Sequence, residues 1–211
     1  LDKARYVTLS HAGISRAGES SNDLLSNPYG KTKVESENII SNYCEKNNLR
    51  AISFRYFNAA GAHPSGAIGE KHDPETHLIP NLIKSIINNQ YNFELYGGKD
   101  NPTGDGTCVR DYIHVSDIVN AHYLGMKKIQ KLNPYNVFNI GSGKGYSIME
   151  VIKGVEAITN KKIDYIHSED RKNEPSYLVA DISKIKNQLE WSIEYNTIES
   201  IIETAWNWHK K

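Results

Sequence analysis

Two β-prone runs on either side of a helical pattern constrain the fold more than any other feature of this sequence. Residues 6–10 read Tyr-Val-Thr-Leu-Ser, and residues 50–55 read Arg-Ala-Ile-Ser-Phe-Arg. Between them, a proline at position 28 and a helical spacing of apolar residues predict a helix over about residues 29–45. A strand–helix–strand succession is typical of a parallel α/β sheet. We therefore predict an α/β fold.

The rest of the chain continues this alternation. We expect a polar, ligand-binding loop at 58–75, a helix opened by Pro80, strands at 93–96, 111–115, 137–140, 162–166 and 177–180, and helices from Ser116, after Ser147 and near the C-terminus. Ser147 and Glu150 have the spacing of a capping box, and Asn196 with Glu199 is the expected cap of the last helix. The glycine run at 141–145 predicts a tight strand-to-helix turn.

Composition excludes several classes of function. The 211 residues carry 25 basic and 25 acidic side chains, so the basic excess of nucleic-acid-binding proteins is absent and no nucleic-acid partner is expected. No apolar run approaches a membrane span, so no membrane partner is expected either. Cys44 and Cys108 have neither disulfide-framework nor metal spacing, which favours a reduced, cytoplasmic protein with no metal. The chain begins with Leu1, which indicates a fragment or a trimmed product.

Tyr29 and Lys33 are the first candidate catalytic pair. They are four residues apart, so a helix places the phenol and the ammonium on one face. A neighbouring cation favours the phenolate and lowers a tyrosine pKa, which makes a general base able to take a proton from a sugar hydroxyl. The alternative is an exposed Tyr and Lys on an ordinary amphipathic helix.

Three further blocks follow Pro-Tyr-Gly-Lys-Thr-Lys at 28–33. They read Arg-Tyr-Phe-Asn-Ala-Ala-Gly-Ala-His at 55–63, Thr-His-Leu-Ile-Pro at 76–80 and Asp-Gly-Thr-Cys-Val-Arg-Asp-Tyr-Ile-His-Val at 105–115. Together the four blocks closely resemble the UDP-glucose 4-epimerases, of the extended short-chain dehydrogenase/reductase superfamily. The resemblance implies the C-terminal part of a doubly wound, Rossmann-like parallel sheet and a smaller α/β substrate-binding lobe. Residues 1–75 then form the second half of the nucleotide-binding domain, and residues 76–211 mainly form the lobe, with segments that return to the first domain.

The resemblance also implies an NAD-dependent reaction. UDP-glucose and UDP-galactose interconvert through a 4-keto sugar, with Tyr29 as acid/base and Lys33 on the nicotinamide ribose. Both residues would contact the cofactor, and Phe57 would lie beside the nicotinamide. Ser10 is the candidate for a serine that hydrogen-bonds the sugar, although alignment of the strand places His11 at that position and Ser10 just before it.

Eight residues match positions that bind the UDP-sugar in the resembled family. These are Asn58, His77, Leu78, Tyr96, Arg110, Arg171, Glu174 and Leu178. The two arginines would bind the diphosphate, because a guanidinium forms two-pronged charged hydrogen bonds with phosphate oxygens. Alternatives remain at three positions: a surface ion pair for Arg110, a loop histidine for His77 and core packing for Tyr96. Glu174 stands where the family usually has the shorter Asp, and Leu178 where some relatives carry a bulky Tyr.

The resembled family also has an N-terminal, glycine-rich segment that binds the NAD pyrophosphate. No G-x-G-x-x-G fingerprint is found, since the run that begins at Gly141 has Tyr146 in its last position. One alternative is therefore a truncated, non-catalytic remnant that binds UDP-sugar or a partner chain. Another is an NAD-dependent sugar-nucleotide dehydratase or decarboxylase of the same superfamily. A complete enzyme is expected to be a homodimer.

Overall fold

The computed structural model describes residues 4–10, 28–89, 93–98, 103–168 and 175–211. The helices are α1 (Pro28–Asn47), α2 (Leu78–Ile87), α3 (Val115–Lys128), the 3-10 helix η2 (Ile129–Lys131), α4 (Ile148–Thr159), α5 (Ser183–Leu189) and α6 (Ile198–His209). The strands are β1 (Ala4–Ser10), β2 (Arg50–Tyr56), β3 (Asn58–Ala60), β4 (Phe93–Tyr96), β5 (Val109–Arg110), β6 (Tyr112–His114), β7 (Tyr135–Ile140), β8 (Tyr146–Ser147), β9 (Tyr165–Ser168) and β10 (Tyr177–Leu178).

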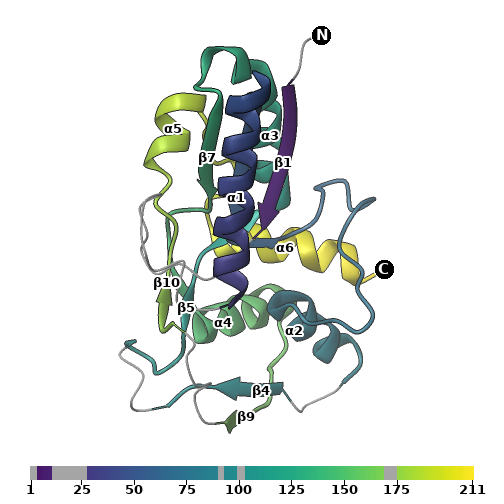
Figure 1. Ribbon diagram of the computed structural model, residues 1–211. Coiled ribbons are helices and arrows are strands. Elements are labelled where there is room, and N and C mark those ends of the chain that lie inside the picture. The colour runs from purple at the N-terminus through teal and green to yellow at the C-terminus, as the bar shows by residue number, and fades with distance from the viewer. Residues whose placement is uncertain (1–3, 11–27, 90–92, 99–102, 169–174) are drawn as a thin grey trace.

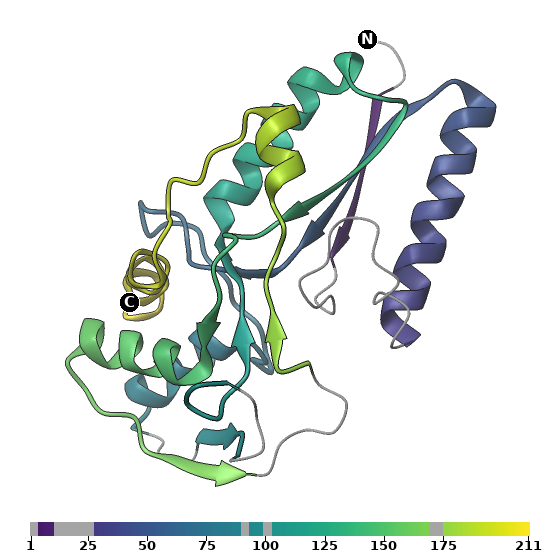
Figure 2. The ribbon, with the colours of Figure 1, turned by 90° about the vertical axis from the view of Figure 1, so that its left-hand side faces the viewer.

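A parallel three-stranded sheet, ordered β1-β2-β7, forms the upper half of the molecule in Figure 1. Helix α1 covers one face of this sheet, and α3 with α5 covers the other (Figure 2). Parallel strands need a crossover connection, and α1 supplies it between β1 and β2. The predicted α/β fold with parallel strands is therefore confirmed.

The central strand explains why both faces need cover. Residues 51–55 of β2 are all buried, including the charged Arg55. Its guanidinium donates two hydrogen bonds to the Glu37 carboxylate of α1, at 2.8 and 2.6 Å. A buried charge has to be paired, because an unpaired ion in the interior is strongly destabilising. This pair therefore joins the largely polar helix α1 to the sheet.

A second hydrophobic core lies below the sheet, where α2, α4 and α6 pack together (Figure 1). Helix α2 buries one apolar face there, formed by Ile79, Leu82, Ile83 and Ile86. The chain passes between the two cores within single elements: Tyr112 of β6 belongs to the lower core and Ile113 to the upper one. The proposed boundary at residue 75 stays a prediction.

Helix starts were predicted with mixed success. The Ser147–Glu150 capping box of α4 is confirmed, with both reciprocal hydrogen bonds present. The cap predicted at Asn196 is wrong: the Thr197 hydroxyl caps α6 by accepting a hydrogen bond from the Ser200 backbone N–H at 3.2 Å. Both residues are good N-cap types, so sequence alone did not separate neighbouring positions.

Other differences concern element ends. Helix α2 begins at Leu78, so Pro80 lies inside its first turn instead of opening it. The loop expected at 58–75 begins with the short strand β3, and the strand expected at 162–166 runs from Tyr165 to Ser168. Across the part of the chain that the structure describes, no helix is both long enough and apolar enough to span a membrane.

Candidate active site

The carboxyl edge of the parallel sheet brings the predicted catalytic segments together, on the side of the sheet that faces the lower half of the molecule (Figure 1). Strands β1, β2 and β7 end there, and Ser10 pairs with Tyr56 in the last rung. Helix α1 runs back along the sheet, so its first turns, with Tyr29 and the half-buried Lys33, stand at the same edge (Figures 1 and 2). In open α/β sheets this is the edge where ligands bind.

A cavity of about 270 Å³ lies beside the lower core, and Leu95 and Tyr112 of that core are among its lining residues. Four predicted substrate-binding residues line it from four different elements: Asn58 from β3, Leu78 from α2, Tyr96 from β4 and Arg110 from β5. The other lining residues are Thr76, Asn81, Phe93, Glu94, Leu95, Cys108, Tyr112 and Ile148. The structure therefore gathers half of the predicted substrate set around one space.

Hydrogen bonds to backbone carbonyl oxygens position two of these side chains. The Asn58 amide donates to the Asp111 carbonyl oxygen at 2.7 Å, and the Asn58 backbone N–H donates to the same oxygen at 3.0 Å. Arg110 lies in β5, which is held between β10 and β8, and its guanidinium donates to the Val109 carbonyl at 2.9 Å. A guanidinium carries N–H donors and no acceptors, which suits it to phosphate oxygens.

Asp111, between the cavity-lining residues Arg110 and Tyr112, holds the turn that follows β7. Its buried carboxylate accepts hydrogen bonds from the Ser142 N–H at 2.6 Å, the Ser142 hydroxyl at 2.7 Å, the Gly143 N–H at 2.9 Å and the Ala180 N–H at 3.1 Å. Burial raises the pKa of the Asp111 carboxyl, and these hydrogen bonds oppose that shift. Gly143 has φ of +73°, so the tight turn predicted at 141–145 is confirmed.

Tyr96 and Arg110 give the cavity an aromatic wall and a cationic group. The Tyr96 hydroxyl donates a hydrogen bond to the Glu94 carboxylate, which holds its ring at the cavity lining. Aromatic rings stack on nucleobases, and guanidinium groups bind diphosphates. The combination suits a nucleoside diphosphate.

Other predicted residues lie away from this lining. Phe57 and Leu178 are 4% and 2% exposed in the upper hydrophobic core. Phe57 follows the end of β2 directly, so its backbone still lies at the carboxyl edge. His77 lies next to the cavity-lining Leu78 but is an exposed residue whose ring bonds Glu70. The roles of these three residues stay predictions.

Arg171 and Glu174 lie outside the described residues. Sequence analysis also missed residues that the structure places at the cavity, notably Thr76 and Asn81. Asn81 follows Leu78 by three positions on α2, and an i, i+3 search from a predicted ligand-binding residue would have found it. The hydrogen bonds of the Asp111 carboxylate were not predicted either, although Asp111 lies within the 105–115 block.

Comparison with known proteins identifies the family of this chain. The model of the NAD dependent epimerase/dehydratase family matches residues 12–141, more than half of the chain. The chain belongs to that family. It is 42% identical over 184 residues to a UDP-glucose 4-epimerase of Lactobacillus helveticus, an alignment that covers 87% of this chain and 56% of the relative.

Solved structures agree with the family assignment. A crystal structure of a UDP-glucose 4-epimerase superposes with a TM-score of 0.89 at 38% identity, covering 99% of this chain and 64% of that one. The Bifidobacterium longum UDP-glucose 4-epimerase in complex with NAD+ and UDP superposes with a TM-score of 0.81 at 30% identity, covering 97% and 63%. The chain thus spans 56–64% of the length of these relatives.

Proposed function

We propose that this chain is the catalytic and substrate-binding part of an NAD-dependent UDP-glucose 4-epimerase. The reaction interconverts UDP-glucose and UDP-galactose through a 4-keto sugar. The observation that carries the proposal is the cavity that gathers Asn58, Leu78, Tyr96 and Arg110. Homology to UDP-glucose 4-epimerases supports the proposal, and one of these relatives was solved in complex with NAD+ and UDP.

Tyr29 is the proposed acid/base. It takes the proton from the sugar 4-hydroxyl in one direction and returns it in the other. Lys33 follows one helical turn later on α1, so its ammonium favours the phenolate form of Tyr29. Such proton transfer by a positioned group contributes about 10²–10⁴-fold to a rate.

The residues present fit the nicotinamide end of NAD. Helix α1 starts at the carboxyl edge of a parallel sheet, which is where Rossmann-type folds bind dinucleotides. Lys33 would hold the nicotinamide ribose, and Phe57 follows the end of the neighbouring strand β2. When bound there, NAD supplies the hydride acceptor and donor of the reaction.

The diphosphate and the base would occupy the cavity. Arg110 would neutralise the diphosphate, Asn58 would hydrogen-bond it through its amide, and Tyr96 would pack on the uracil. The Asp111 carbonyl fixes the Asn58 amide nitrogen, so this group is already oriented before a ligand arrives. Such preorganisation lowers the cost of binding.

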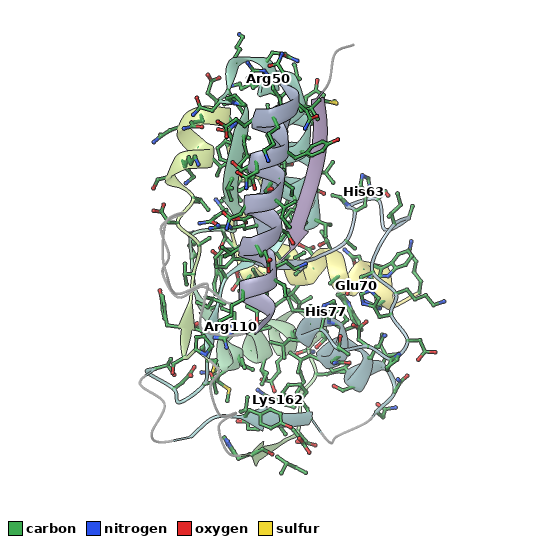
Figure 3. All side chains as sticks on the ribbon, in the orientation of Figure 1. Arg50, His63, Glu70, His77, Arg110 and Lys162 are labelled. Atoms are coloured by element: carbon green, nitrogen blue, oxygen red, sulfur yellow. The ribbon has the colours of Figure 1, made fainter. Side chains whose placement is uncertain are left out.

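A binding experiment tests the substrate site without requiring turnover. UDP is titrated calorimetrically into the protein and its Arg110→Ala variant. Lys162→Ala is the control, because that lysine is an exposed cation that lines no part of the cavity (both residues are labelled in Figure 3). Arg110→Ala should weaken UDP binding by about 10–100-fold, the value of a hydrogen bond to a charged group. Equal affinity in all three proteins would contradict the proposed cavity.

A turnover experiment tests the proposed catalysis. The chain is fused behind the N-terminal part of the Lactobacillus helveticus relative, and conversion of UDP-galactose is followed. Tyr29→Phe should lower turnover by about 10²–10⁴-fold. Tyr43→Phe, a tyrosine of the same helix that is 55% exposed, is the matched control and should keep full activity. Near-parental turnover in Tyr29→Phe would refute the assignment.

The alignment covers only part of each relative, so the non-catalytic alternative is tested as well. We expect the 211-residue chain alone neither to retain NAD nor to convert UDP-galactose, because it carries no glycine-rich pyrophosphate fingerprint. Stoichiometric NAD released on denaturation would contradict this expectation. UDP binding by the chain without conversion by the fusion would instead favour a binding remnant. A sugar-nucleotide dehydratase or decarboxylase would release a different product from the fusion.

A further inference from the structure

Four side chains with metal-ligand atoms converge in the loop between β3 and α2. These are Glu70, His72, Glu75 and His77, and one ligand atom from each lies within 4.8 Å of all the others. Figure 3 shows Glu70 and His77 beside each other on this side of the molecule. Neither the family match nor the proposed function assigns a role to this group of four.

The four ligand atoms lie close to one another. The Nδ1 atom of His72 lies 2.8 Å from Oε1 of Glu70, and the Nδ1 atom of His77 contacts the same oxygen. Oε1 of Glu75 lies 3.7 Å from both Nδ1 atoms. Two imidazole nitrogens and two carboxylate oxygens therefore lie within 4.8 Å of one another, close enough for one cation to contact all four.

Contacts outside the cluster hold Glu75 in place. Its side chain is 4% exposed, and Oε1 accepts the backbone N–H groups of Thr76 at 3.0 Å and His77 at 3.1 Å. Its other oxygen, Oε2, pairs with the Lys84 ammonium of α2 at 3.1 Å. Lys84 therefore neutralises the outer oxygen and leaves Oε1 directed at the histidines.

The loop itself is fastened to the C-terminal helix. The indole N–H of Trp208 donates to the Glu70 carbonyl oxygen at 2.8 Å. A Cβ atom on Gly69 would lie 2.4 Å from the Trp208 ring, so only glycine permits this packing. Outer contacts that orient ligands in this way are typical of metal sites.

We propose that Glu70, His72, Glu75 and His77 bind one divalent transition-metal ion, with Zn²⁺ as the best fit. Imidazole nitrogen excludes a preference for Mg²⁺ or Ca²⁺, which take oxygen ligands, and two nitrogens with two oxygens suit four-coordinate zinc. The ion would tie the loop to the start of α2. Thr76 and Leu78, which line the cavity, lie on either side of His77. The cation would thus brace one wall of the proposed substrate cavity.

Metal titration of the tag-free protein tests this inference. Zn²⁺ and, separately, Co²⁺ are titrated by calorimetry and by the visible absorption of bound cobalt. One ion per chain is expected. His72→Ala and Glu70→Gln should each weaken binding at least about 10-fold, because the first removes a ligand and the second replaces a charged carboxylate by a neutral amide. His63→Ala is the matched control, since His63 is an exposed histidine of the same loop that bonds Ser65. It should bind like the parent.

Metal binding is measured independently of the proposed function, so either idea can fail without the other. His72 and Glu70 line no part of the cavity, and metal binding does not depend on UDP, NAD or turnover. Tyr29→Phe should therefore bind the ion normally. Circular dichroism confirms that each variant is folded. Failure of the parent protein to bind one ion, unchanged affinity in both ligand variants, or loss of binding in His63→Ala would each overturn the assignment.

Discussion

Asp111→Asn should destabilise this protein strongly, although the two side chains have almost the same shape. In the parent, one carboxylate oxygen accepts from the N–H and hydroxyl of Ser142, and the other accepts from the N–H groups of Gly143 and Ala180. An asparagine amide has only one oxygen, and its NH₂ group is a donor. In one orientation of the amide, its NH₂ group faces the N–H groups of Gly143 and Ala180. In the other it faces the N–H of Ser142, whose hydroxyl can turn to accept a hydrogen bond and donate to the Lys144 carbonyl. One or two donors of the protein are therefore left without an acceptor.

The size of the effect follows from burial. Asp111 is 0% exposed, and its partners Ser142 and Ala180 are buried, whereas Gly143 lies at the surface. A buried donor left without an acceptor costs about 1–3 kcal/mol, and the amide orientation that leaves only one such donor is the cheaper one. Loss of the buried charge offsets part of this cost. We expect a net loss of about 2 kcal/mol, a substantial fraction of the 5–15 kcal/mol that is typical of a domain.

Urea unfolding followed by circular dichroism measures this loss as a change in the free energy of unfolding. Asp181→Asn is the control, because the exposed Asp181 carboxylate accepts a hydrogen bond from the Ser183 N–H at the start of α5. Asparagine serves such a position about as well, so the control should change stability by less than about 0.5 kcal/mol. A loss below about 1 kcal/mol in Asp111→Asn would refute this account of the turn.

Three further predictions concern buried or closely packed positions. Burial lowers the pKa of His114 to about 4, so below about pH 6.5 the unfolded chain gains a proton that the folded chain does not. The free energy of unfolding should therefore fall by up to about 3 kcal/mol between pH 6.5 and 4. In urea unfolding, His114→Gln should show a flatter pH dependence. Gly61→Ala should cost about 2–4 kcal/mol in the same assay, because Gly61 has φ of +82° and a Cβ atom would lie 2.5 Å from the His114 ring; parental stability would contradict it. If Leu178 walls the sugar site, leucine leaves more room than tyrosine, so the fused enzyme should also convert UDP-N-acetylglucosamine, and a strong preference for the non-acetylated sugars in a side-by-side assay would count against it.

Much of the site could be predicted only as separate short segments. The blocks at 55–63, 76–80 and 105–115 supplied Asn58, Leu78 and Arg110 as candidates, and the structure places all three around one cavity. Their sequence spacing carries no information on that proximity, because packing of the lower core brings the segments together. For the same reason, burial of Leu178 in the upper core became visible only in three dimensions.

The sequence by itself determined the local elements and the family. Alternating and helical hydrophobic spacing depends on neighbours a few residues apart, which is why the strand at 50–55, the helix after Pro28 and the Ser147 capping box could be predicted. Tertiary structure decided the rest: the pairing of β2 with β7, the four donors around Asp111 and the centre shared by two histidines and two glutamates. These arrangements depend on distances between segments that only the packed chain defines, since the free energy of burial acts on surfaces that meet across the core and not along the sequence.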